Sequence, residues 1–256
     1  MPVRAGTATV LTCALSAVLV LAGCTPAPSP PAAPAKGPAK APAGAAAPPR
    51  EVRGGADRAP SRIPGVGPRT QARVPAGTTQ VLVVSGESAD GNTATAVLYE
   101  REPAGRWHRT AGPWVGHNAL RGWTENHVAG DLRSPTGVFR LGDAGGRLPD
   151  PGARVPYDQD EEFAVSGTGF LGEPLEGSFD YVVAIDYNRV PGTTPLNKER
   201  PLGPEKGGGV WIHVDHGGPT QACVSLPRED MTELLRALDP VREPVVVMGP
   251  AAVLAR

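Results

Sequence analysis

A proline-rich stretch near the N-terminus sets the strongest limit on how much of this chain can fold. Residues 25–76 hold 13 of the 30 prolines, and no Phe, Trp or Tyr occurs before Tyr99. Such a segment buries too little apolar area to offset the entropy lost on ordering it. We therefore predict a semi-extended linker over residues 24–76 and one folded domain over residues 77–250, which is long enough for a real core.

The residues before this linker have the features of an export signal. Arg4 is the only charge before the apolar residues 10–22, a segment of signal-peptide length that is short for a bilayer span. The segment ends in Leu-Ala-Gly before Cys24, which resembles a bacterial lipobox. The resemblance implies removal of residues 1–23 and acylation of the Cys24 thiol, which would anchor the protein at the outer face of the cytoplasmic membrane or cell wall. Ordinary signal cleavage and an uncleaved anchor are the alternatives.

Charge and cysteine content narrow the class of protein further. Without Arg4 the chain has 24 basic and 26 acidic residues, a net charge of −2, whereas a nucleic-acid binder would show a basic surface. If residues 1–23 are removed with Cys13 and Cys24 is acylated, Cys223 has no partner within the chain, which excludes a disulfide framework. A lone thiol is either a small buried apolar side chain or a reactive group.

The folded part is predicted to be mainly β. Runs of β-branched and aromatic residues bounded by Gly, Pro or Asn predict six strands, at residues 79–85, 94–100, 136–141, 181–187, 210–214 and 244–248. The first two are expected to be joined as a hairpin through residues 85–92. Residues 142–180, rich in Gly, Pro and acids, predict long loops that could cover a cleft, with one short strand near Phe163.

One segment has a helical period. Residues 228–238 place four apolar side chains on one face, namely Met231, Leu234, Leu235 and Leu238. Pro227 suits the first helical position, and Asp239-Pro240 ends the segment. The predicted fold is therefore mainly β, with one short helix after Cys223.

The residues around Cys223 are those that a cysteine nucleophile requires. Such a nucleophile needs a base or a positive environment, amides aimed at a developing oxyanion, and a group that orients the base. His213 ends a predicted strand, and a Gly-Gly-Pro turn can return the chain past it. The turn at residues 220–223 offers amides, and the dipole of the helix after Pro227 is expected to favour the thiolate. These residues predict a Cys–His acyl-transfer site with a lowered thiol pKa.

Three segments resemble the L,D-transpeptidase catalytic domain, also called the YkuD family. The first is Ile212-His213 followed by TQACVSLP at residues 220–227. GDLRSPTGVF at residues 130–139 and YVVAIDYN at residues 181–188 resemble two upstream family segments and occur in the family's order. The likeness covers about residues 79–250.

The resemblance implies a fold, a reaction and a site. The fold would be a β-sandwich-like domain with mixed sheets. Cys223 would attack the peptide bond after the third residue of a peptidoglycan stem, D-Ala would leave, and an amine of a second stem would complete a 3→3 cross-link. His213 would be the general base, and the amides of Ala222 and Cys223 would form the oxyanion hole. No metal or organic cofactor is implied, and carbapenem-like β-lactams would be expected to acylate the thiol.

The chain also departs from the family pattern. Gln221-Ala222 stand where the family has His-Gly, and the loop from His213 to Cys223 is shorter. If position 222 needs a positive φ, Ala costs about 1–2 kcal/mol there. These departures leave open a catalytically weak wall-binding module. An L,D-carboxypeptidase with water as acceptor also stays open, because groove shape and water access choose the acceptor.

Several polar residues have weaker functional interpretations. Thr220, Tyr187 and Asn188 are carried as possible substrate contacts. His216 could be a second base or a substrate contact, but a solvated turn is the simpler interpretation. A metal site on His213 and His216 is disfavoured because strand positions three apart face opposite sides. His117 and His127 could line a peptide groove, although surface-loop histidines are the simpler interpretation.

Overall fold

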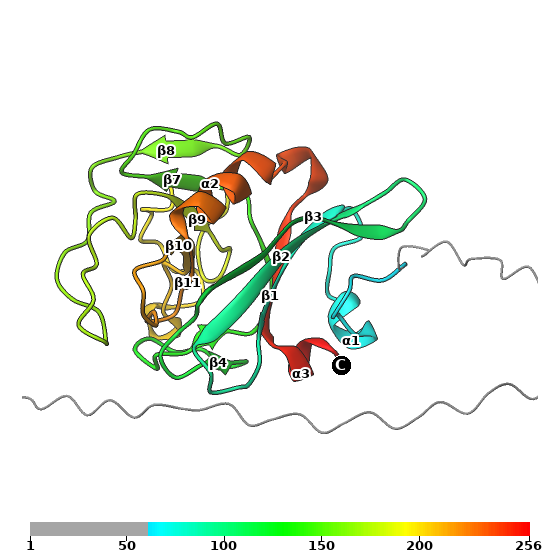
Figure 1. The fold of residues 1–256 in the computed structure, drawn as a ribbon, viewed down its shortest axis with the longest axis horizontal. Helices are drawn as coiled ribbons and strands as arrows, with labels where there is room; N and C mark the ends of the chain where they lie inside the picture. The colour runs from blue at the N-terminus through cyan, green and yellow to red at the C-terminus, as the bar shows by residue number, and fades with distance from the viewer. Residues whose placement is uncertain (1–60) are drawn as a thin grey trace, which may run out of the picture. The chain divides into compact units, whose positions relative to one another are not determined.

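The computed structural model describes residues 61–256. The predicted signal peptide, Cys24 and most of the linker lie outside the described residues. Twelve strands and three α-helices make up the domain (Figure 1). The strands are β1 Gln80–Gly86, β2 Thr93–Arg101, β3 Trp107–His117, β4 Trp123–Thr124, β5 Ser134–Pro135, β6 Gly137–Arg140, β7 Ala144–Gly146, β8 Tyr157–Gln159, β9 Val182–Ala184, β10 Trp211–Val214, β11 Val224–Leu226 and β12 Val245–Pro250. The helices are α1 Pro68–Gln71, α2 Arg228–Ala237 and α3 Ala251–Leu254, with 3-10 turns at Pro204–Lys206 and Pro240–Arg242.

The predicted mainly-β class is confirmed, but most strands belong to a single sheet. Ten strands run in the order β6-β12-β1-β2-β3-β11-β10-β9-β7-β8, and β4 pairs with β5 separately. The pairs β1–β12, β10–β11 and β7–β8 are parallel, so the sheet is mixed. The Asp186 amide, just after β9, donates to the Arg140 carbonyl of β6 at 3.0 Å, although these strands are far apart in the order. The sheet therefore curls so that the residues after β9 meet the β6 edge.

All six predicted strands are present, and others were missed. Residues 181–187 shorten to β9, and β1 and β2 form the predicted antiparallel hairpin. The eleven-residue β3 was not predicted, because Gly112-Pro113 inside it argues against a strand. A register shift between Ala96 and Leu98 of β2 accommodates that interruption. No strand forms at Phe163, which is a buried loop residue; the strands of that region are β7 and β8.

The packed part of the chain begins before residue 77 and continues past residue 250. Ile63 and Val66 are buried with Leu254 in a small apolar cluster. The Gly67 amide donates to the Leu254 carbonyl at 2.9 Å, which joins the start of α1 to α3. Ile63 and Val66 stand alone among Pro and Gly residues and form no periodic pattern. The prediction for residues 61–76 therefore rested on composition, which indicated a linker.

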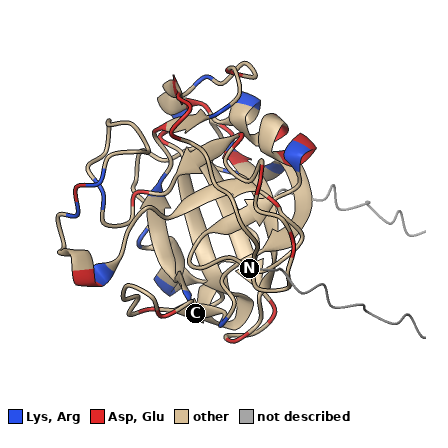
Figure 2. Cartoon of the chain, turned by 90° about the vertical axis from the view of Figure 1, so that its left-hand side faces the viewer, with Lys and Arg blue, Asp and Glu red and all other residues tan. Residues whose placement is uncertain are grey.

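Helix α2 forms where the apolar period predicted it. Met231, Leu234 and Leu235 are fully buried against the sheet. Pro227 precedes the helix as its N-cap and is not its first residue. In the view of Figure 2, basic and acidic segments are interspersed over the described domain.

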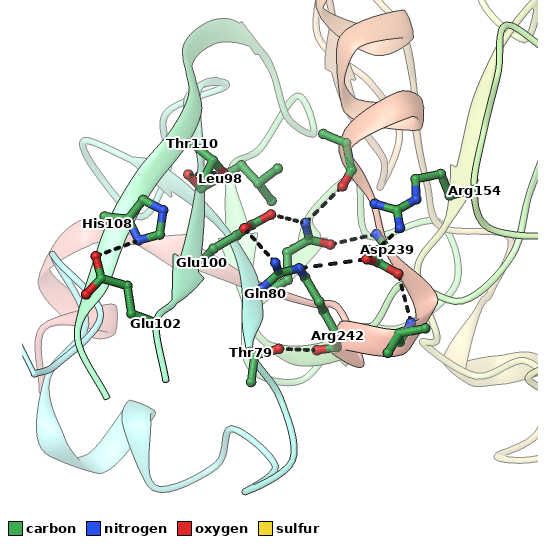
Figure 3. Close-up of polar contacts among 12 residues, drawn as sticks. Thr79, Gln80, Leu98, Glu100, Glu102, His108, Thr110, Arg154, Asp239 and Arg242 are labelled. Atoms are coloured by element: carbon green, nitrogen blue, oxygen red, sulfur yellow. Dashed lines mark hydrogen bonds and ion pairs between the residues drawn. The ribbon is translucent and has the colours of Figure 1, made fainter. Parts of the chain in front are cut away.

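Gln80 fastens the end of α2 to β1 (Figure 3). Its Nε2 donates to Glu100 Oε1 and to the Ala237 carbonyl, both at 2.9 Å. Its Oε1 accepts from the Asp239 amide at 2.9 Å. The side chain is fully buried, so a single amide group satisfies the polar groups that the helix end leaves unpaired.

A Gln80→Met variant is expected to lose about 1–3 kcal/mol of unfolding free energy, because the Ala237 carbonyl and the Asp239 amide stay buried without partners. Urea denaturation followed by circular dichroism measures the loss. Thr110→Ala is the matched control, since Thr110 is exposed and its hydroxyl makes one long bond of 3.4 Å to the Leu98 carbonyl. Equal, small losses in the two variants would refute this role for Gln80.

Candidate active site

One cleft of about 490 Å³ contains most of the residues predicted to form a site. Residues 127–132, 165–179 and 207–223 contribute its walls, so the long loops after β8 line it as predicted. Figure 1 shows these yellow-green loops beside β10 and β11. The predicted site residues in the lining are His213, His216, Thr220, Ala222 and Cys223.

The pairing of β10 with β11 explains why Cys223 and His213 share this cleft. The strands are parallel, with His213 opposite Ser225 and Ile212 opposite Val224. Facing residues project to the same side of a sheet, and side chains alternate along each strand. Cys223 is two residues before Ser225, so it lies on the His213 face, offset by about 6–7 Å along the strand.

The Cys223 thiol is held by backbone groups. Its Sγ accepts from the Trp211 amide at 3.4 Å and donates to the Gly209 carbonyl at 3.6 Å. No hydrogen bond joins Cys223 to His213 within residues 61–256. Removal from water raises the pKa of the Cys223 thiol to about 11, and the Trp211 amide offsets this only in part. The predicted lowering of the thiol pKa is therefore wrong for the resting cleft.

The helix dipole does not reach the sulfur. Strand β11 lies between Cys223 and α2, which places three extended residues, about 10 Å, between the thiol and the helix end. A helix dipole acts mainly within its first turn. The expectation that α2 favours the thiolate is wrong because β11 was not predicted.

His213 is a neutral imidazole with one nitrogen available. Its side chain is buried, and because a carbonyl only accepts, the 2.9 Å contact with the Val214 oxygen places the proton on Nδ1. Burial lowers the pKa of His213 to about 4; the Val214 bond opposes this, and the neighbouring His216 adds to it. The other nitrogen, Nε2, is left as a hydrogen-bond acceptor in a side chain that lines the cleft.

The turn before Cys223 is fixed by two hydroxyl groups. Thr220 Oγ1 and Ser134 Oγ donate to the Cys223 carbonyl at 2.6 Å and 3.1 Å. Ser134 Oγ also accepts from the Ala119 amide at 3.0 Å. Thr220 thus holds the backbone at the thiol, and Ser134 was missed as its partner although it lies in the family-like segment 130–139.

Ala222 is not strained. Its φ is not positive, so the free-energy cost expected from replacing Gly with Ala does not arise. Among residues 61–256, the amides of Ala222 and Cys223 donate to no protein acceptor, and both residues line the cleft. Neither N–H group has a protein partner in this described part of the chain, so both are available to a ligand that reaches them.

His216 is not a solvated turn residue. Strand β10 ends at Val214, and the turn that follows returns the His216 ring over His213, with centroids 5.8 Å apart and planes 10° apart. The strand alternation used to separate the two rings therefore does not apply. His216 Nδ1 lies 3.1 Å from Glu173 Oε1, and both side chains are largely buried. Glu173 was not predicted, since nothing in the sequence pairs residues so far apart.

His117 and His127 also have defined roles in packing. His127 is buried in the cleft wall, with Nδ1 3.0 Å from Asp131 Oδ1 but without hydrogen-bond alignment. His117 ends β3, and its Nδ1 lies 2.8 Å from Asp215 Oδ1. The surface-loop interpretation of both residues is wrong.

Tyr187 and Asn188 do not line the cleft. The Tyr187 hydroxyl donates to the Lys206 carbonyl at 2.9 Å, and Asn188 Nδ2 donates to the Gly203 and Gly207 carbonyls. The two side chains hold the loop that carries Gly207–Gly209 into the cleft wall. Tyr187 and Asn188 therefore support this loop, and the structure does not place them where they were predicted to contact substrate.

Alkylation of Cys223 by iodoacetamide is expected to be slow at pH 7 and to rise with pH towards about 11, because only the thiolate reacts. The initial rate is measured by intact mass across a pH series. The urea-unfolded protein is the control and should react with an ordinary thiol profile. A fast reaction that is already constant below pH 8 would contradict the neutral resting state.

The described residues show neither a candidate metal site nor a helix that could span a membrane. In residues 61–256, no three His, Cys, Asp or Glu side chains are grouped so as to hold a metal ion. No helix of that part of the chain has the length and apolar character needed to cross a bilayer. No protein-family model matches this chain, and no curated protein matches it either.

Proposed function

We propose that this protein is a cysteine-dependent acyltransferase of the L,D-transpeptidase type that acts on peptidoglycan stem peptides. One observation carries the proposal: Cys223 and His213 lie on one face of β10–β11, in one cleft, beside the unpaired amides of Ala222 and Cys223. A cleft of about 490 Å³ is of the size that binds a short peptide. The family-like segments supply the substrate class.

The first half-reaction forms a thioester. Cys223 Sγ attacks the carbonyl carbon of the third stem residue while His213 Nε2 takes the thiol proton. The oxyanion accepts hydrogen bonds from the amides of Ala222 and Cys223. The C–N bond then breaks, and His213 returns the proton to the leaving D-Ala amine. Because thiol and imidazole are both neutral at rest, the proton moves as the C–S bond forms and not before.

The second half-reaction resolves the thioester. An acceptor amine attacks the same carbonyl carbon, and His213 takes a proton from it. The C–S bond breaks, and the proton passes to Sγ, which restores the thiol. No metal or organic cofactor takes part in either step. Acylation of Cys24 and the proline-rich linker would hold the domain at the outer face of the membrane, where peptidoglycan lies.

A second candidate is a binding module that holds stem peptides without cleaving them. The absence of a Cys223–His213 hydrogen bond in residues 61–256 and the raised thiol pKa favour it. In this case the cleft would bind the peptide and the thiol would stay protonated.

A tetrapeptide stem incubated with an amine acceptor distinguishes these functions. We use the chain from residue 25 onward, which leaves out the signal and Cys24, and follow D-Ala release and product mass. A joined product supports the transpeptidase, and a tripeptide alone means that water is the acceptor. Saturable peptide binding without D-Ala release would replace the enzyme by the binding module.

A further inference from the structure

A small hairpin forms one wall of the cleft. Residues 167–175 are closed by the bridge between Thr168 and Pro174 and by the bond from the Leu175 amide to the Gly167 carbonyl. Its tip carries Phe170 and Leu171, which are 44% and 72% exposed. Phe170 also lines the cleft, so the hairpin presents apolar surface where a bound peptide would lie.

One polar contact joins this hairpin to the part of the chain that follows residue 178. Among the polar contacts of residues 61–256, only the one between Glu173 Oε1 and His216 Nδ1 links the hairpin to a residue beyond 178. The carboxylate also accepts from the Leu171 amide at 2.7 Å and fits closely against Gly218, where an added Cβ would lie 2.0 Å from Oε1. Burial alone would raise the pKa of Glu173, but backbone amides and His216 together lower it, so the group is an anion at neutral pH.

The ring of His216 also restrains His213, the proposed base. The His216 ring stacks on His213, and the edge of Phe179 contacts His213 with centroids 5.3 Å apart. Together with the bond from Nδ1 to the Val214 carbonyl, these contacts fix the plane of the His213 ring. Glu173, His216 and His213 thus form a chain of contacts from the hairpin to the base.

We propose that His216 is a positioning residue, and that the Glu173–His216 contact couples closure of the hairpin to the orientation of His213. This inference rests on the proposed function, since it assigns His213 the role of base. With the hairpin closed, His216 is fixed by Glu173 and holds His213 in place. With the hairpin released, His216 has no partner and His213 loses one of the surfaces that orient it. A peptide that packs under Phe170 would therefore complete the site as it binds.

The test uses the rate of Cys223 acylation by a carbapenem in the chain from residue 25 onward. Glu173→Ala is expected to slow acylation about 10- to 100-fold, as a small misplacement of a catalytic group does. Glu173→Gln keeps an acceptor for His216 Nδ1 and is expected to restore most of the rate. His216→Phe keeps a flat ring against His213 but loses the contact with Glu173, so it should match Glu173→Ala.

The double variant Glu173→Ala/His216→Phe is expected to be no slower than either single variant, because both remove the same contact. Glu176→Ala is the matched control, an exposed acid of the neighbouring loop for which the structure shows no partner among residues 61–256. Wild-type acylation rates in folded Glu173→Ala, or losses that multiply in the double variant, would overturn the inference.

A second readout separates failure of this inference from failure of the proposed function. Chymotrypsin cleavage at Phe170 or Leu171 should be faster in Glu173→Ala than in wild type, because the hairpin is released. If wild type forms no adduct, the proposed function fails, and equal cleavage of the two proteins would then reject the coupling as well. If wild type is acylated and Glu173→Ala is acylated equally fast, only the coupling fails.

Discussion

Wild-type protein is expected to gain the mass of one carbapenem molecule, and the Cys223→Ala variant is expected to gain none. The β-lactam carbonyl would lie where the stem carbonyl lies, between Cys223 Sγ and the unpaired amides of Ala222 and Cys223. Ring opening leaves a stable thioester that intact mass spectrometry detects. Cys223 is the free thiol of the described domain, so no other cysteine there can carry the adduct.

His213 should govern the rate of this reaction. His213→Asn is expected to slow acylation about 10²- to 10⁴-fold at pH 7, the range expected for loss of a general base. The rate in wild type should fall as pH drops towards about 4, where His213 becomes protonated and can no longer accept a proton. His108→Asn is the control, because His108 is an exposed histidine of β3 far from the cleft lining. Equal rates in the two variants would remove His213 from the mechanism.

The largest loss of stability is expected from Arg189→Met. Arg189 Nη1 donates to Asp143 Oδ2 at 2.7 Å and also contacts Asp186, and all three side chains are almost fully buried. Without the guanidinium, the two buried carboxylates lose the countercharge that contacts both of them, which costs about 3–5 kcal/mol of unfolding free energy. Urea denaturation at pH 7 measures this loss.

The pH dependence of that loss has a definite sign. Burial already raises the pKa of Asp186, and Arg189 opposes the rise. In the variant the pKa of Asp186 is raised further, so the folded state binds protons more readily than the unfolded state and the deficit should shrink as the pH falls below 7. Arg133→Met is the control: Arg133 pairs with Asp90, which is 79% exposed, so its loss should cost under about 1 kcal/mol at either pH. Equal deficits in both variants would show that burial of the ion pair is unimportant.

The strands that could be predicted are those whose own residues form a run typical of a β-strand. The runs that became β1, β2 and β12 are β-branched and alternate or pack on both sides. Strand β3 was hidden by Gly112-Pro113, and β11 has only three residues, too few for a pattern. The missed β11 mattered most, since its pairing with β10 places Cys223 beside His213 and keeps it away from α2.

The candidate site residues could be identified from the sequence, but their protonation states could not be predicted from it. His213 and Cys223 could be picked out because both residue types suit acyl transfer and lie ten positions apart. Their pKa values depend on how deeply the fold buries them and on groups that it brings close, such as the Trp211 amide at the thiol and the His216 ring over His213. Glu173 reaches His216 across 43 positions, a contact that tertiary packing alone creates.

The backbone groups that contact Cys223 bear on how this thiol would survive in the oxidising compartment that the proposed export implies. Oxidants such as peroxides attack the thiolate, and the sulfenic acid that forms leads on to irreversible products. Because burial raises the pKa of Cys223 to about 11, the thiol is almost entirely protonated at pH 7. Burial and the Gly209 carbonyl, which accepts a hydrogen bond from the thiol, therefore protect the sulfur by keeping it protonated, while the Trp211 amide opposes this in part. A reactive sulfur can persist in an oxidising compartment if it is exposed to attack only during turnover.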